Sequence, residues 1–74
     1  MEVTVKLYSS LRKNNQPSHK VQLQQGNTVT DLLRELNIGH HEVEVVVVNG
    51  NLSQFDTQLT HQDQVGLIPF VSGG

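Results

Sequence analysis

The sequence predicts an α+β domain in which one main helix packs across one face of a mixed sheet of four to five strands. Three observations predict this class. Segments near both ends alternate apolar and polar residues, one internal segment repeats apolar residues at helical spacing, and 74 residues leave room for only one core. Hydrophobic residues make up 35% of the chain and aromatic residues only 4%. The core must therefore be built from aliphatic side chains.

The N-terminal part has the pattern of a β-hairpin. Residues 2–8 alternate in character, which is typical of a half-buried strand, and the inward positions are Val3, Val5 and Leu7. The polar stretch that contains Pro17 predicts a turn. A second, less apolar strand is expected over residues 19–24 and completes the hairpin.

The middle of the chain contains the clearest helix signal. Apolar side chains fall at i, i+3, i+4 and i+7, at Val29, Leu32, Leu33 and Leu36. Thr28 is the expected N-cap, and Asp31 three residues later predicts an arrangement like a capping box. Gly39 is expected to take the left-handed conformation that often follows a helix. Three turns are too short to be stable alone, so this apolar face must pack on the sheet.

A third strand is expected over residues 42–48, which are rich in valine. If the glutamates of this segment face outward, Val43, Val45 and Val47 face inward. Four consecutive valines, however, leave the phase of the strand end open.

The remaining segments are shorter. Asn49-Gly50 is a strong turn signal, and a brief strand is expected near Leu52. The last strand is expected over residues 64–68, with Val65 and Leu67 inward. Pro69 should end its regular pairing or lie at a sheet edge.

Composition excludes several functional classes. The absence of cysteine excludes disulfides, thiolate metal sites and a cysteine nucleophile. The net charge of −2 argues against general nucleic-acid binding. The longest apolar run, Val45 to Val48, is far too short to span a membrane, and no signal peptide is evident, so we expect a cytoplasmic protein. The four histidines are expected to be solvated loop residues rather than metal ligands: His19, His40, His41 and His61.

The end of the chain is the strongest candidate for chemistry. We expect residues 1–70 to form the domain and residues 71–74 to form a flexible tail that ends in Gly73-Gly74. A Gly-Gly end has no side chains, so it can thread a narrow channel of another enzyme and present the terminal carboxylate. Activation of a carboxylate requires ATP, for which this chain has no binding motif. The chemistry must then be supplied by a partner, unless the glycines are simply an inert chain end.

Several stretches together resemble the sulfur-carrier proteins of the MoaD/ThiS type, which have the ubiquitin-like β-grasp fold. They span nearly the whole chain: VKLYSSLR (5–12), TVTDLL (28–33), VVNG (47–50), DQV (63–65) and PFVSGG (69–74). The opening with Leu11-Arg12 and the ending with Pro69 look more like the molybdopterin branch, the small subunit of molybdopterin synthase, than like the thiamine branch.

The resemblance implies a cycle centred on Gly74. An E1-like enzyme adenylates its carboxylate with ATP, and a sulfur donor protein converts it to a thiocarboxylate. The carrier then docks on the large subunit of molybdopterin synthase, or an equivalent acceptor enzyme, which takes the sulfur. The carrier itself is expected to hold no cofactor and no metal.

A docking surface is expected beside the tail. Ile68 and Tyr8 are predicted to lie on the sheet face opposite the helix, and Phe70 to continue this apolar stripe. The partner-binding residues are therefore expected to be Tyr8, Ile68, Phe70, Val71, Ser72 and Gly73. Three other functions remain open: a thiamine-type or other sulfur carrier, a ubiquitin-like modifier conjugated through Gly74, and a non-covalent interaction module.

Overall fold

The computed structural model describes residues 1–12 and 16–70. The five strands are β1 (Glu2–Leu7), β2 (Ser18–Gln22), β3 (Val43–Val48), β4 (Asn51–Ser53) and β5 (Gln64–Pro69). The helix α1 spans Val29–Leu36, and two short 3-10 helices, η1 and η2, span Ser9–Leu11 and His40–Glu42. The predicted tail of residues 71–74 lies outside the described residues. Within those residues, no helix is long and apolar enough to cross a membrane.

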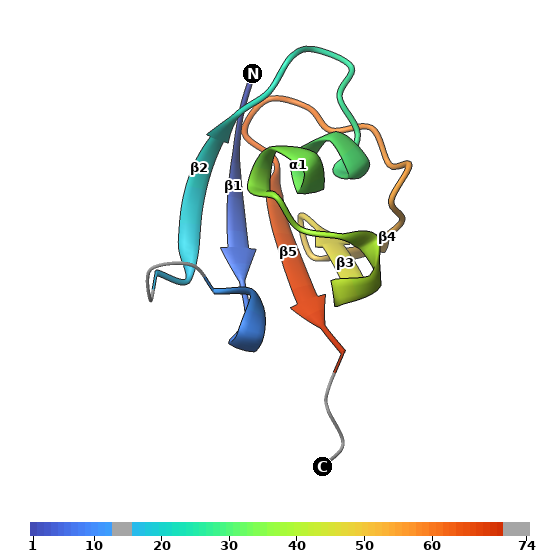
Figure 1. Cartoon of the computed structure of the whole chain (residues 1–74). Helices are drawn as coiled ribbons and strands as arrows, with labels where there is room; N and C mark the ends of the chain where they lie inside the picture. The colour runs from blue at the N-terminus through green and yellow to red at the C-terminus, as the bar shows by residue number, and fades with distance from the viewer. Residues whose placement is uncertain (13–15, 71–74) are drawn as a thin grey trace.

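The strands form one mixed sheet in the order β2-β1-β5-β3-β4 (Figure 1). The central pair, β1 and β5, is parallel, and the other three pairs are antiparallel. This confirms the predicted α+β class with a mixed sheet. Pro69 ends β5 opposite Val43, beyond the last pair that β5 makes with β1, so its missing N–H costs no bond to β1.

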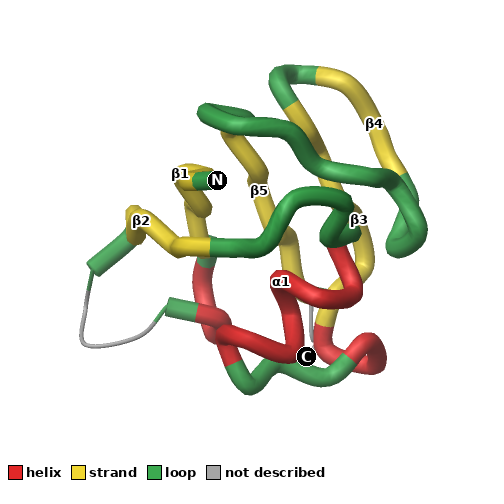
Figure 2. Tube along the Cα trace, turned by 90° about the horizontal axis from the view of Figure 1, so that it is seen from above, coloured by secondary structure: helices red, strands yellow, loops and turns green. Residues whose placement is uncertain are grey.

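The core lies between α1 and one face of the sheet (Figure 2). The inward residues of β1 and β5 are almost completely buried, as are the helix residues Val29, Leu32 and Leu33. Leu36 is only partly buried and packs at the margin. The core is aliphatic as predicted, because all fifteen of its buried members are Val, Leu or Ile.

The helix begins as the sequence predicts. The backbone N–H of Thr28 donates to the Asp31 carboxylate at 2.8 Å, and the Thr28 hydroxyl donates to the same oxygen at 3.2 Å. These bonds satisfy groups that the first helical turn leaves unpaired.

The prediction for the end of the helix was wrong. Asn37, with φ 61°, takes the left-handed position, whereas Gly39 has φ −83° and precedes η2. Asparagine is one of the few residues other than glycine that tolerates this conformation. Gly39 instead donates its N–H to the Glu42 carboxylate at 2.8 Å.

The structure resolves the phase of β3, which the sequence left open: of the three valines that outward glutamates would place inside, only Val43 is buried. Val43, Val46 and Val48 are buried, whereas Val45 and Val47 are only partly buried. The pairing with β5 shifts register between Val43 and Val45, which marks a β-bulge and reverses the alternation. The bulge turns Val45 and Val47 to the face opposite the helix.

Candidate functional site: the outer face of the sheet

The sheet face that α1 leaves uncovered, here called the outer face, is defined by strand alternation. On β5, Val65 and Leu67 are buried against the helix, so Gly66 and Ile68 belong to the other face. Residues that pair directly across a sheet share a face. The outer face therefore also contains the partners Val45 (opposite Ile68), Val47 and Lys6 (opposite Gly66), and Leu52 (opposite Val47).

Tyr8 follows β1 and covers the centre of this face. Its Cε2 lies 3.7 Å from the point that a Cβ on Gly66 would occupy, so the ring packs above the glycine. The Lys6 amine lies 5.3 Å from the centre of the Tyr8 ring, close enough for a cation–π contact. The Tyr8 ring thus lies over Gly66 at ordinary contact distance from the position of a Cβ.

The structure brings Tyr8 and Ile68 together. Both line a shallow hollow of about 300 Å³ on the outer face, together with Val47 and Gly66. Phe70, directly after β5, is 57% exposed, which is unusual for a large apolar side chain. The other predicted partner-binding residues, Val71, Ser72 and Gly73, and the predicted reactive Gly74 lie outside the described residues.

Sequence reasoning missed the half of this surface that comes from β3 and β4. Leu52 is 81% exposed, the highest exposure of any large apolar side chain among the described residues. It pairs with Val47, so the apolar stripe runs across several strands rather than along β5 alone. An exposed leucine beside an Asn-Gly turn was the available signal, but the bulge in β3 hid the outward phase of Val47.

A polar network fixes the start of β5 beneath this face. The Asn49 side chain donates to the Asp63 carboxylate at 2.8 Å and accepts from the Gln64 N–H at 2.9 Å. The Thr60 N–H and hydroxyl also donate to Asp63, at 2.8 and 3.0 Å. Burial alone would raise the pKa of Asp63, but these bonds stabilise the carboxylate and its pKa lies below the usual value.

Two of the histidines contact residues from distant parts of the chain. The His40 ring stacks on Phe55, with centroids 4.3 Å apart, and His61 Nδ1 accepts from the Glu2 N–H at 3.0 Å. His19 lies within β2, and His40 and His41 lie in η2, so the prediction of loop positions was wrong for these three. Among residues 1–12 and 16–70, no three side chains of the metal-binding types gather at one point.

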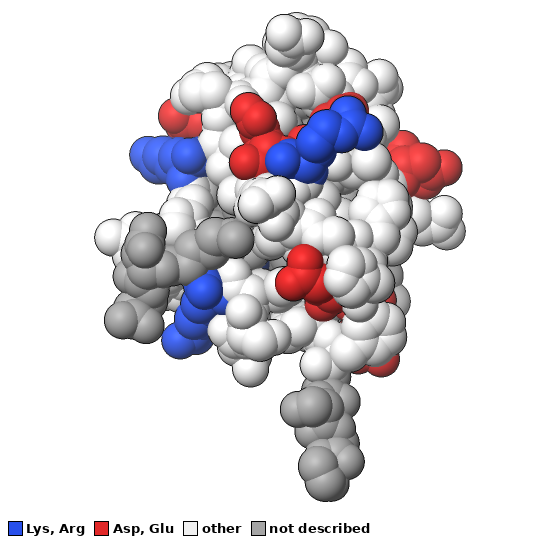
Figure 3. Space-filling view, viewed as in Figure 1, with Lys and Arg blue, Asp and Glu red and all other residues white. Residues whose placement is uncertain are grey.

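Acidic and basic side chains are interspersed on the face shown in Figure 3.

A five-stranded mixed sheet with a parallel central pair and one helix across a single face defines a ubiquitin-like β-grasp domain. The family model of ThiS matches residues 5–74. The chain therefore belongs to the ThiS family of sulfur-carrier, ubiquitin-like proteins, as the sequence predicted. No curated protein matches the chain by sequence.

Three solved structures with the same fold are of proteins with different names and pathways. One structure of small archaeal modifier protein 1 of Haloferax volcanii is 21% identical, with a TM-score of 0.77 and 100% of both chains covered. A putative molybdopterin converting factor subunit 1 of Pyrococcus furiosus is 25% identical, with a TM-score of 0.76. The match covers 95% of this chain and 98% of the other. A thiamine biosynthesis protein of Geobacter metallireducens is 31% identical, with a TM-score of 0.60. The match covers 100% of this chain and 88% of the other.

A further structure contains a partner. It is a complex of subunits 1 and 2 of the molybdopterin-converting factor of Helicobacter pylori, and it matches with 21% identity and a TM-score of 0.63 over 100% of both chains. At this identity the likeness shows the fold.

Proposed function

We propose that this protein is a sulfur carrier whose Gly74 carboxylate is converted to a thiocarboxylate, and that it supplies sulfur for molybdopterin synthesis. The observation that carries the proposal is the extent of the family match, which runs through the domain and includes Gly73-Gly74 at its end. A partly apolar face beside the last strand supports it, because a carrier must dock before its tail can enter another enzyme.

In the proposed cycle the chain acts as a substrate. A Gly74 carboxylate oxygen attacks the α-phosphorus of ATP in an E1-like enzyme, and pyrophosphate leaves. A hydrosulfide equivalent from a sulfur donor protein then attacks the acyl carbon, AMP leaves with the former carboxylate oxygen, and the thiocarboxylate remains. The acceptor enzyme takes the sulfur, and water restores the carboxylate. ATP is bound and consumed by the partner, and this chain supplies the acyl group and the docking surface.

The molybdopterin pathway is supported by the Pyrococcus neighbour, which is alike over almost its whole length, and by the Helicobacter complex. The latter makes the large subunit of a molybdopterin synthase the proposed acceptor. The Geobacter neighbour has higher identity but a lower TM-score, so a thiamine-type carrier is the second candidate. The Haloferax modifier protein supports a third candidate, conjugation to other proteins through Gly74.

The first test is the intact mass of the chain after incubation with an E1-like enzyme, ATP and a sulfur source. A carrier gains the mass difference between one sulfur and one oxygen atom. Because the chain has no cysteine, a thiol-alkylating reagent should label the treated chain and leave the untreated chain unlabelled. A variant that lacks Gly73-Gly74 is the negative control, and Glu35→Gln on the exposed side of α1 is the matched full-length control. A full-length chain that gains neither mass nor label with such enzymes contradicts the proposal.

The second test separates the pathways. The thiocarboxylated chain is mixed with the large subunit of a molybdopterin synthase or with a thiazole-forming synthase of thiamine biosynthesis, each with its own substrate. Return of the carboxylate mass with only one of them identifies the acceptor. Isopeptide-linked products of the chain in cell extract, dependent on Gly74, would instead favour the modifier function.

A further inference from the structure

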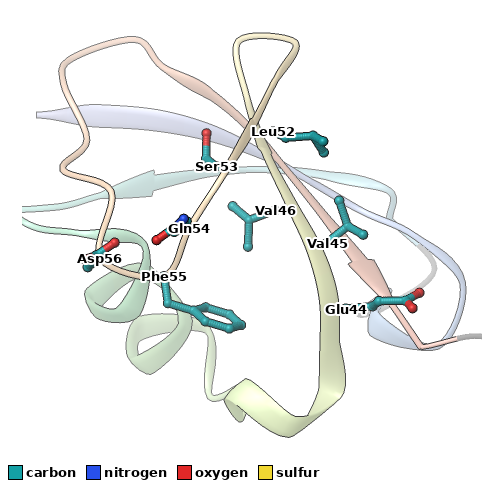
Figure 4. Close-up of a pocket in the computed structure, with 8 residues that line it drawn as sticks. All are labelled: Glu44, Val45, Val46, Leu52, Ser53, Gln54, Phe55 and Asp56. Carbon is teal, nitrogen blue, oxygen red and sulfur yellow. The ribbon is translucent and has the colours of Figure 1, made fainter.

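A second surface lies at the edge of the sheet beside β3 and β4, and it meets the outer face at Val45 and Leu52. We name it the edge groove, and it is lined by Glu44, Val45, Val46, Leu52, Ser53, Gln54, Phe55 and Asp56 (Figure 4). Its volume is about 510 Å³, which is within the range of binding sites for small ligands and single side chains.

The groove exists because β4 is too short to cover β3. β4 pairs only with Val46 to Val48, so the first half of β3, Val43 to Val45, has no strand on that side. After Ser53 the chain leaves the sheet in a turn held by Gln54 and Thr57, whose N–H donates to the Gln54 carbonyl at 3.1 Å. An uncovered strand edge offers backbone donors and acceptors to an extended segment.

The far wall of the groove is rigidly attached to the helix. The Phe55 carbonyl accepts two bonds from Thr30, from its N–H at 2.9 Å and its hydroxyl at 3.0 Å. The Phe55 ring stacks almost parallel on His40, with 8° between the planes. In Figure 4 the ring projects into the space between its own turn and β3. The groove therefore has an apolar, preformed wall opposite an open strand edge.

The charge of the groove specifies its occupant. The two charged residues of its lining, Glu44 and Asp56, are both acidic, and they come from opposite walls (Figure 4). Both are exposed, and neither takes part in the one ion pair that the described residues contain, between Arg34 and Asp31. A ligand with basic side chains is thus complementary, whereas a second copy of the chain would bring Glu44 and Asp56 against their own counterparts.

We propose that the edge groove binds an extended, lysine- or arginine-containing segment of a partner protein, which adds a strand beside Val43 to Val45. The segment places an apolar side chain against Phe55 on the helix side, and Leu52 borders it from the outer face. Val43 is the residue that pairs with Pro69 at the end of β5. A segment bound here lies two strand spacings, about 10 Å, from the point where the chain leaves the sheet toward Gly74. The groove thus positions a partner near the end of β5 and leaves the hollow at Tyr8 and Ile68 free.

The test is an NMR titration of the isotope-labelled full chain with a blocked hexapeptide of alternating valine and lysine. The control is the same peptide with glutamate in place of lysine. The expected result is a saturable shift of the amides of residues 43–46 and 52–56 with the lysine peptide only. Glu44→Gln and Asp56→Asn should each weaken binding by up to about fivefold, the effect of one exposed ion pair. Glu35→Gln removes the same charge elsewhere and should leave the affinity unchanged.

Leu52→Thr provides a variant that keeps the fold, because the leucine is 81% exposed and threonine favours strands. It should weaken binding of the lysine peptide while the unfolding midpoint stays the same. Equal shifts with both peptides, shifts confined to β2 or to the hollow around Tyr8 and Gly66, or no shift at millimolar peptide would each overturn the proposal. Shifts of residues 43–46 that appear on concentrating the chain alone would identify a second copy as the occupant and overturn it too.

Discussion

The Asn49 side chain and the Asp63 carboxylate are joined by a 2.8 Å hydrogen bond between residues 14 positions apart. The bond connects the turn after β3 with the start of β5. Asp63 is 8% exposed and is the one charged residue among the buried side chains of the described chain. Its carboxylate accepts from three donors on Asn49 and Thr60, so its removal would break all three bonds.

Asp63→Ala is therefore expected to lower the free energy of unfolding by about 1–3 kcal/mol, because hydrogen bonds to a charged group contribute roughly this much. Urea unfolding followed by circular dichroism measures the change. Asp56→Ala is the matched control, because this exposed aspartate should change stability by less than about 0.5 kcal/mol. Similar losses in both variants would show that the network contributes little.

The same network predicts the response of the fold to acid. Because the pKa of Asp63 is lowered in the folded protein, the unfolded chain binds its proton first as the pH falls. The contribution of Asp63 to stability is complete well above its ordinary pKa of 3.8 and is lost as the pH falls from there through the lower folded pKa.

Thermal unfolding between pH 7 and pH 2 tests this prediction. The midpoint of wild type should fall more steeply below about pH 4 than that of Asp63→Asn, which has no carboxylate at this position. Asp31 also has a lowered pKa, chiefly because the Thr28 N–H donates to it, so both proteins should retain some acid sensitivity. Parallel curves for the two proteins would contradict the assignment to Asp63.

The outer face predicts which substitutions separate docking from folding. Phe70→Ala and Tyr8→Ala should each weaken binding to the activating or acceptor enzyme by roughly thirtyfold, or about 2 kcal/mol, if they act as interface hot spots. Isothermal titration calorimetry measures the affinity, and the unfolding midpoint of Phe70→Ala should hardly change because Phe70 is 57% exposed. Glu35→Ala on the helix side serves as the control. Unchanged affinity in both variants would remove the outer face from docking.

The elements that the sequence predicted well are those that local patterns determine. The helix was predicted from the spacing of Val29, Leu32 and Leu33, all buried, and its start from Thr28 and Asp31. The apolar spacing and the cap each lie within one segment, so they can be recognised without knowing how the rest of the chain folds.

The features that were missed depend on contacts between distant segments. The bulge at Glu44 is set by the register of β3 against β5, and a run of valines does not reveal its own phase. The pairing of Asn49 with Asp63 arises only when the third and last strands meet. The edge groove likewise results from the shortness of β4 relative to β3. These are tertiary effects, which single-segment patterns do not encode.

Two glycines of the described chain should respond in opposite ways to alanine. Gly66 lies in β5, and a Cβ there would be 3.7 Å from Tyr8 Cε2 and 3.8 Å from the Val47 Cβ, which are ordinary contact distances. Gly66→Ala should therefore raise the free energy of unfolding by roughly 0.5–1 kcal/mol, because alanine loses less backbone entropy than glycine in a strand.

Gly50→Ala should have the opposite effect. Gly50 has φ 83° in the turn after Asn49, and no atom lies within 4 Å of the added Cβ. The substitution should therefore lower the free energy of unfolding through backbone strain alone, by about 1 kcal/mol or more. Urea unfolding of both variants and wild type measures the two changes. A loss of stability in Gly66→Ala would mean that the Tyr8 ring lies too close to β5 to admit a methyl group, and the hollow of the outer face would then be tighter than the structure indicates.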